Sequence, residues 1–142
     1  IAKDEEQAAV REAIEELSNV VREYNCMVMI HNCGEKIYFD AQIKRMDPVA
    51  ISFLYPPDDC ASFAECKEKY GDKVTLIGCV TPANAVFGTD EEWDKQCTDQ
   101  IDAMAKGGGF MLATGCEYPA NATFDRAQRM IDIAKTYGVY KK

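Results

Sequence analysis

Apolar residues are spaced in two different ways along the chain, one typical of helices and one typical of buried strands. Over residues 4–24 they recur at intervals of three and four, with charged residues between them, which predicts an amphipathic helix. Four short runs are apolar at consecutive positions, as expected for parallel strands that are covered on both faces. These runs cover residues 26–30, 49–54, 74–78 and 110–114, and further helices are predicted over residues 36–46, 59–70, 89–106 and 123–137.

Several residues mark the expected ends of these helices. Thr89 is followed three residues later by Glu92, which matches a capping box. Gly71 is expected to end a helix as a left-handed cap. The glycines at 107–109 resemble a phosphate-binding loop in composition, but they join a helix to the following strand, so a helix cap and tight turn is the favoured interpretation.

The order of these elements is one helix followed by four strand-then-helix units. Because such crossovers are right-handed, the strands are predicted to form one parallel sheet in an α/β fold. A complete eight-stranded β/α barrel needs about 250 residues, whereas this chain has 142 residues and half of the strands. Two architectures fit the pattern: half of a (β/α)8 TIM-type barrel, or a small open doubly wound sheet. In both, residues 1–142 form a single domain.

Composition and charge limit which partners and which cellular location we expect for the protein. The net charge of −8 disfavours binding to nucleic acid, and no apolar run approaches the ~18 residues of a membrane helix. The seven cysteines are scattered and odd in number, and no signal peptide precedes them, so we expect a soluble protein of the cytoplasm. The chain starts with Ile1 inside a helical pattern, and we expect it to be a piece of a longer protein.

Two clusters at the expected strand ends carry candidate metal ligands. His31 and Cys33 follow the first strand and, two residues apart in an extended chain, point to the same side. Cys116 follows the fourth strand, and functional groups of α/β folds gather at this edge of the sheet. The three residues would form a His-Cys-Cys set, which is typical of a catalytic zinc site with one open position. The alternative is that both cysteines pack as small apolar side chains and that His31 bonds to a loop.

Several motifs together resemble a known family. They are HNCG at 31–34, GDKVTLIG at 71–78, FGT at 87–89, KGGGF at 106–110 and GCEYP at 115–119. With these motifs the chain resembles the carboxyl-terminal half of the uroporphyrinogen decarboxylase superfamily. The pairing of H-x-C-G with a later G-C-E is similar to the cobamide-dependent methyltransferase branch, which passes a methyl group from a methylated corrinoid protein to a thiol such as coenzyme M. The resemblance implies a β/α barrel and so favours the half-barrel.

The resemblance also implies a site and its partners. His31, Cys33 and Cys116 would bind zinc, and Glu117 is the candidate catalytic residue, expected to orient a metal ligand; a solvated charge at the rim is the alternative for Glu117. A small thiol and a protein carrying the corrinoid (methylcobamide) would be the partners. Two other functions stay open, a tetrapyrrole decarboxylase and a non-catalytic corrinoid- or metal-binding module. Because half a barrel leaves sheet edges open, we also expect the chain to belong to a longer protein or to form a homodimer.

Overall fold

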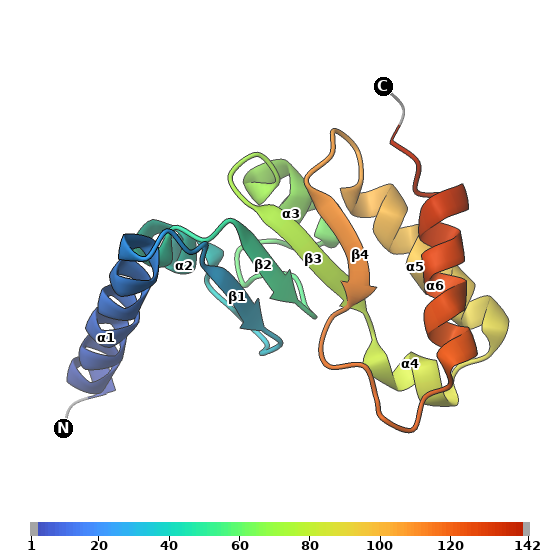
Figure 1. Ribbon diagram of the computed structural model, residues 1–142, viewed down its shortest axis with the longest axis horizontal. Helices are drawn as coiled ribbons and strands as arrows, with labels where there is room; N and C mark the ends of the chain where they lie inside the picture. Colours follow the sequence, from blue (N-terminus) through green and yellow to red (C-terminus); the bar gives the residue numbers. More distant parts are fainter. Residues whose placement is uncertain (1–2, 141–142) are drawn as a thin grey trace.

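The computed structural model describes residues 3–140, with side chains from residue 11 onward, and has an α/β architecture (Figure 1). Within these residues, four parallel strands form one sheet in the order β1-β2-β3-β4. The strands are β1 (Met29–Asn32), β2 (Ala50–Phe53), β3 (Thr75–Val80) and β4 (Phe110–Thr114). The helices are α1 (Lys3–Glu23), α2 (Phe39–Met46), α3 (Phe63–Tyr70), α4 (Pro82–Phe87), α5 (Asp90–Met104) and α6 (Phe124–Thr136). This arrangement is consistent with half of a TIM-type barrel, as predicted.

The two faces of the sheet differ in character. On one face Ile51, Phe53 and Leu76 are fully buried in the main core, which also contains Tyr70 of α3 and Met104 of α5. The other face carries alternate residues of the same strands, and there the side chains of Met29, His31 and Met111 are exposed. Because neighbours along a strand point to opposite faces, the strand sequence separates a packed side from an open one.

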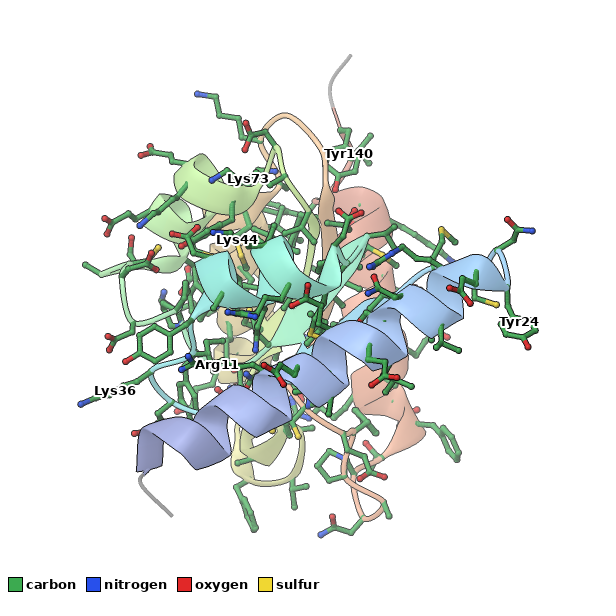
Figure 2. All side chains as sticks on the ribbon, turned by 90° about the vertical axis from the view of Figure 1, so that its left-hand side faces the viewer. Arg11, Tyr24, Lys36, Lys44, Lys73 and Tyr140 are labelled. Carbon is green, nitrogen blue, oxygen red and sulfur yellow. The ribbon has the colours of Figure 1, made fainter. Side chains whose placement is uncertain are left out.

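Helix α1 lies apart from the sheet and packs against α2. Arg22 donates a hydrogen bond of 2.6 Å to the Met46 carbonyl, and Arg45 forms an ion pair of 3.1 Å with Glu15. In Figure 2, where these two helices face the viewer, the labelled Tyr24 projects away from the ribbon at the end of α1. No helix within residues 3–140 is long and apolar enough to cross a membrane. Ile1, on which the expectation of a longer chain depends, lies outside the described residues.

The structure departs from the predicted elements in several places. Helix α2 begins at Phe39 rather than at residue 36, α3 begins at Phe63 rather than at residue 59, and β3 continues to Val80 rather than ending at residue 78. The first strand begins at Met29 rather than at residue 26, because a turn with Asn25 at φ 55° follows α1 and Met27 is exposed. The short helix α4 was not predicted; it begins with Pro82 in its first turn, where a missing backbone N–H costs nothing. The first strand also ends later, at Asn32 rather than at residue 30, which places His31 inside it instead of after it.

The helix-end predictions had mixed outcomes. The capping box is confirmed, because the Thr89 hydroxyl accepts from the Glu92 N–H at 3.2 Å and the Glu92 carboxylate accepts from the Thr89 N–H at 2.8 Å. The tight turn at 107–109 is also confirmed, with φ of 80°, 83° and 66°. The left-handed cap at Gly71 was wrong: its φ is −69°. Glycine is needed there for space, since a Cβ would lie 2.6 Å from the Lys67 carbonyl oxygen.

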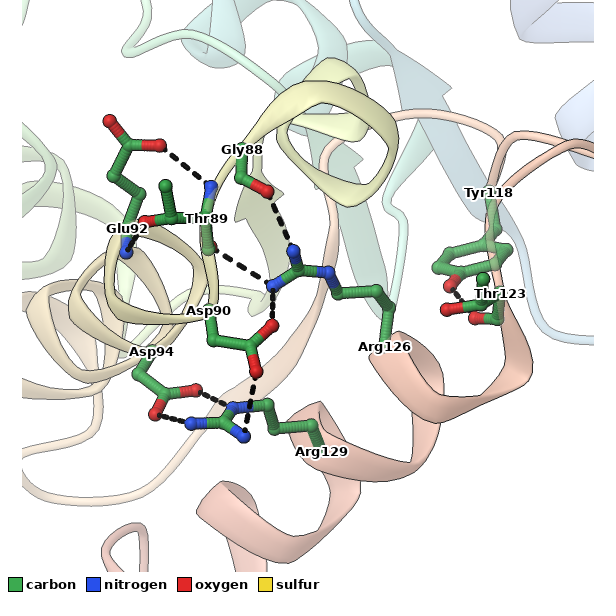
Figure 3. Close-up of polar contacts among 9 residues, drawn as sticks. All are labelled: Gly88, Thr89, Asp90, Glu92, Asp94, Tyr118, Thr123, Arg126 and Arg129. Atoms are coloured by element: carbon green, nitrogen blue, oxygen red, sulfur yellow. Dashed lines mark hydrogen bonds and ion pairs between the residues drawn. The ribbon is translucent and has the colours of Figure 1, made fainter.

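Two arginines of α6 join this helix to the start of α5 (Figure 3). Arg126 donates to the carbonyls of Gly88 and Thr89, at 2.6 and 3.0 Å, and forms an ion pair of 2.8 Å with Asp90. Arg129 pairs with Asp94. The Arg126 side chain is 15% exposed and the Arg129 side chain is 42% exposed, so the two contacts differ in how strongly water screens them.

Replacing Arg126 by Ala is expected to cost about 2–3 kcal/mol of unfolding free energy, because two carbonyls of the α4–α5 turn lose a charged donor. Arg129→Ala, one helical turn away, is the matched control and is expected to cost about 1 kcal/mol or less, as an exposed ion pair does. Urea denaturation of both variants measures the difference. Equal losses would contradict this description of the α5–α6 contact.

Candidate metal centre

The structure brings together the three residues predicted as ligands. His31 lies in β1, Cys33 follows the end of that strand, and Cys116 follows β4. Each residue offers one ligand atom, and these three atoms lie within 4.8 Å of one another: a ring nitrogen of His31 and the sulfur atoms of Cys33 and Cys116. His31 is exposed and the two cysteines are half-buried, so the group is open to solvent at the carboxyl ends of the strands.

Cys116 reaches this group from the far side of the sheet. Strands β1 and β4 are separated by β2 and β3, and in a flat sheet with a strand spacing of about 4.8 Å their ends would be about 14 Å apart. The backbone at Gly115 closes this distance by lying over the ends of the inner strands. Its N–H donates to the Val80 carbonyl at 2.8 Å, which fastens the segment to the end of β3.

Only a residue without a side chain fits at position 115. A Cβ there would lie 2.7 Å from the Leu54 Cα and 2.9 Å from the Phe53 carbonyl oxygen, both of them backbone atoms at the end of β2. Gly78 on β3 makes a similar approach, since its Cβ would lie 2.4 Å from the same Phe53 oxygen. The glycine in the GCEYP motif is therefore what allows Cys116 to approach His31.

The loop that follows Cys116 is held by its own hydrogen bonds. The Thr114 hydroxyl donates to the Cys116 carbonyl at 2.7 Å, and the Tyr118 hydroxyl donates to the Thr123 carbonyl at 2.6 Å (Figure 3). On the opposite side of the group, the Gly34 N–H donates to the Asn32 side chain at 3.1 Å. Both cysteines therefore lie in short turns with local support.

A serine that was not among the predicted site residues contacts the histidine. The Oγ of Ser52 lies 3.1 Å from Nδ1 of His31, and the two residues are direct register partners on β2 and β1. Ser52 is the polar position within the apolar run 49–54. A lone hydroxyl in an apolar strand could have marked Ser52 as a site residue. Its contact with His31 depends on strand register, however, which the sequence pattern does not specify.

Cys33 and Cys116 differ from the cysteines that lie in the core. Side-chain hydrogen bonding with Cys116 raises the pKa of Cys33 above its ordinary value, and desolvation adds to this effect. Elsewhere, burial raises the pKa of Cys66 and of Cys97 to about 12 each, and both side chains lie in the core. Those two are packed thiols, whereas Cys33 and Cys116 form an accessible pair.

Glu117 is exposed at the rim, directly after Cys116. Among the residues that the structure describes, its carboxylate makes no hydrogen bond or ion pair and does not join the three-residue group. Its role in orienting a metal ligand stays a prediction.

The donor set and its spacing fit a zinc ion. One imidazole and two thiolates are ligands that zinc prefers, and three protein ligands leave one of four positions open. With bonds of about 2.0–2.3 Å, donors at the corners of a tetrahedron lie about 3.5–3.8 Å apart. Donors already within 4.8 Å of one another need to move by only about an ångström to reach that spacing.

Comparison with models of known families identifies the family of this chain. The profile of the family described as uroporphyrinogen decarboxylase matches residues 4–137, which include all four strands and the three candidate ligands. Searches of curated proteins and of solved structures found no match. Members of the matched family are generally enzymes. Because the match spans nearly the whole sequence, the chain belongs to the uroporphyrinogen decarboxylase family.

Proposed function

We propose that this protein is a zinc-dependent methyltransferase that moves a methyl group from a methylated corrinoid protein to a small thiol such as coenzyme M. The observation that carries the proposal is the convergence of His31, Cys33 and Cys116 at the carboxyl ends of the strands. Sites of barrel enzymes lie at that end. A decarboxylase acting on a tetrapyrrole would need cations to hold several carboxylates, and the candidate ligands are instead one imidazole and two thiols.

In the proposed reaction the three residues hold the metal and leave room for the acceptor. Bound there, Zn²⁺ would stabilise the thiolate form of the acceptor thiol at neutral pH. His31, in β1, and the short turns after β1 and β4 keep the ligands in place. Because the group is open to solvent, an acceptor thiol and a corrinoid protein would have access to it.

The open face of the sheet around His31 is partly apolar. His31, Ile77 and Met111 belong to one row of register partners on the open face of the sheet, so apolar side chains lie on the same face as the imidazole. His31 and Met111 are both exposed, so this face leaves the site open to solvent. Glu117, at the rim beside Cys116, is proposed to orient a metal ligand.

Methyl transfer is the direct test of the function. Zinc-loaded protein is incubated with methylcobalamin and a panel of thiols that includes coenzyme M, and methyl thioether is measured. Cys116→Ala is expected to lower the rate by about 100-fold or more, since Lewis-acid activation is worth several kcal/mol. Cys26→Ala, which changes an exposed thiol outside the group, is expected to keep the rate of the parent.

Absence of methyl thioether with every thiol would overturn the methyltransferase proposal. Release of CO2 from a tetrapyrrole carboxylate by the same preparation would instead favour the decarboxylase.

Gly115→Ala tests how Cys116 is positioned. The added Cβ meets backbone atoms of Leu54 and Phe53 that no side-chain rotation can move, so the segment must shift and carry Cys116 with it. Zinc affinity, measured by competition with a chromophoric chelator, is expected to fall by about 10- to 100-fold, as it does when groups that orient a metal ligand are lost.

Gly107→Ala is the matched control for this change. Its φ of 80° strains an alanine, but no atom lies within 4 Å of the added Cβ, and the residue is at the opposite end of β4. This variant is expected to lose stability and to keep its zinc affinity. Equal zinc affinities of the parent and Gly115→Ala would contradict the positioning role.

A further inference from the structure

Ser52 contacts the imidazole ring of His31 through one of its two ring nitrogens. The two residues are register partners on adjacent strands, and their side chains meet on the open face of the sheet with 3.1 Å between Oγ and Nδ1. Ser52 lies between Ile51 and Phe53, both fully buried in the core. The hydroxyl is therefore attached to one of the best-packed parts of the sheet.

While Nδ1 keeps its contact with the Ser52 hydroxyl, a metal would have to bind at Nε2. A neutral imidazole carries one proton, on either Nδ1 or Nε2, and only the unprotonated nitrogen can bind a metal. If the hydroxyl donated to Nδ1, the proton would lie on Nε2 and would have to leave before a metal could bind. If Nδ1–H donates to the hydroxyl oxygen, Nε2 is free.

We propose that Ser52 is a positioning residue that accepts a hydrogen bond from Nδ1–H of His31 and holds the ring in the tautomer whose Nε2 binds zinc. The consequence for zinc rests on the proposed function, whereas the tautomer itself is a property of the metal-free protein. Partners of this kind fix the orientation and protonation of ligating histidines in metal sites. The serine hydroxyl can accept this bond and still donate to water on the open face.

The chain offers an unusually clear test, because His31 is its only histidine. Protein labelled with 15N in histidine, reduced and metal-free, gives ring signals from this residue alone at a pH where the imidazole is neutral. Long-range 1H–15N spectra are recorded for the parent, Ser52→Thr and Ser52→Val. Threonine and valine are closely similar in shape and both suit a strand, so the pair isolates the hydroxyl.

The parent and Ser52→Thr are expected to show the Nδ1–H tautomer, and Ser52→Val is expected to shift toward Nε2–H. A parent with the proton on Nε2, or identical spectra for the threonine and valine variants, would overturn the proposal. Circular dichroism of both variants checks that the fold is retained.

Zinc affinity separates this inference from the proposed function. By chelator competition, Ser52→Val is expected to bind zinc about 10- to 100-fold more weakly than the parent, and Ser52→Thr is expected to retain the affinity. Equal affinities of the two variants would overturn the positioning role. If the parent itself binds no zinc, the proposed function fails, while the ring spectra still decide whether Ser52 sets the tautomer.

Discussion

The close approach of the Gly115 backbone to the end of β2 is the constraint on which the candidate site depends. A side chain at this position would overlap the Leu54 Cα and the Phe53 carbonyl. Without that approach, Cys116 would remain near the β4 edge, separated from His31 by the width of two strands. The site is thus a product of backbone contact between strand ends, and it needs no long loop to bring its third ligand into place.

Residues on the packed face of the sheet hold the neighbouring residues of the open face in position. Ile51 and Phe53 of β2 are buried against the helices, and Ser52 between them points the other way, toward His31. In a strand this alternation is obligatory, so the core residues that hold β2 also hold the hydroxyl that contacts the imidazole. Core packing and the position of the candidate histidine ligand are in this way linked through three consecutive residues.

Much of this arrangement could be predicted from the sequence. The four strands and the capping box at Thr89 follow from local periodicity and side-chain chemistry, and the proximity of the three candidate ligands follows from the rule that strand ends converge. The contact of Ser52 with His31 could not be predicted, because it depends on register between strands that are far apart in the sequence. The steric need for glycine at 71 and 115 depends in the same way on neighbours that only the folded chain provides.

X-ray absorption at the zinc K edge tests the central claim most directly. Protein reconstituted with one equivalent of zinc is expected to show two sulfur atoms at about 2.3 Å and a histidine nitrogen at about 2.0–2.1 Å, with a fourth light atom at the open position. Cys116→Ala is expected to leave one sulfur. Failure to retain one equivalent of zinc, or a first shell of oxygen and nitrogen without sulfur, would contradict the assignment of His31, Cys33 and Cys116 as a metal centre.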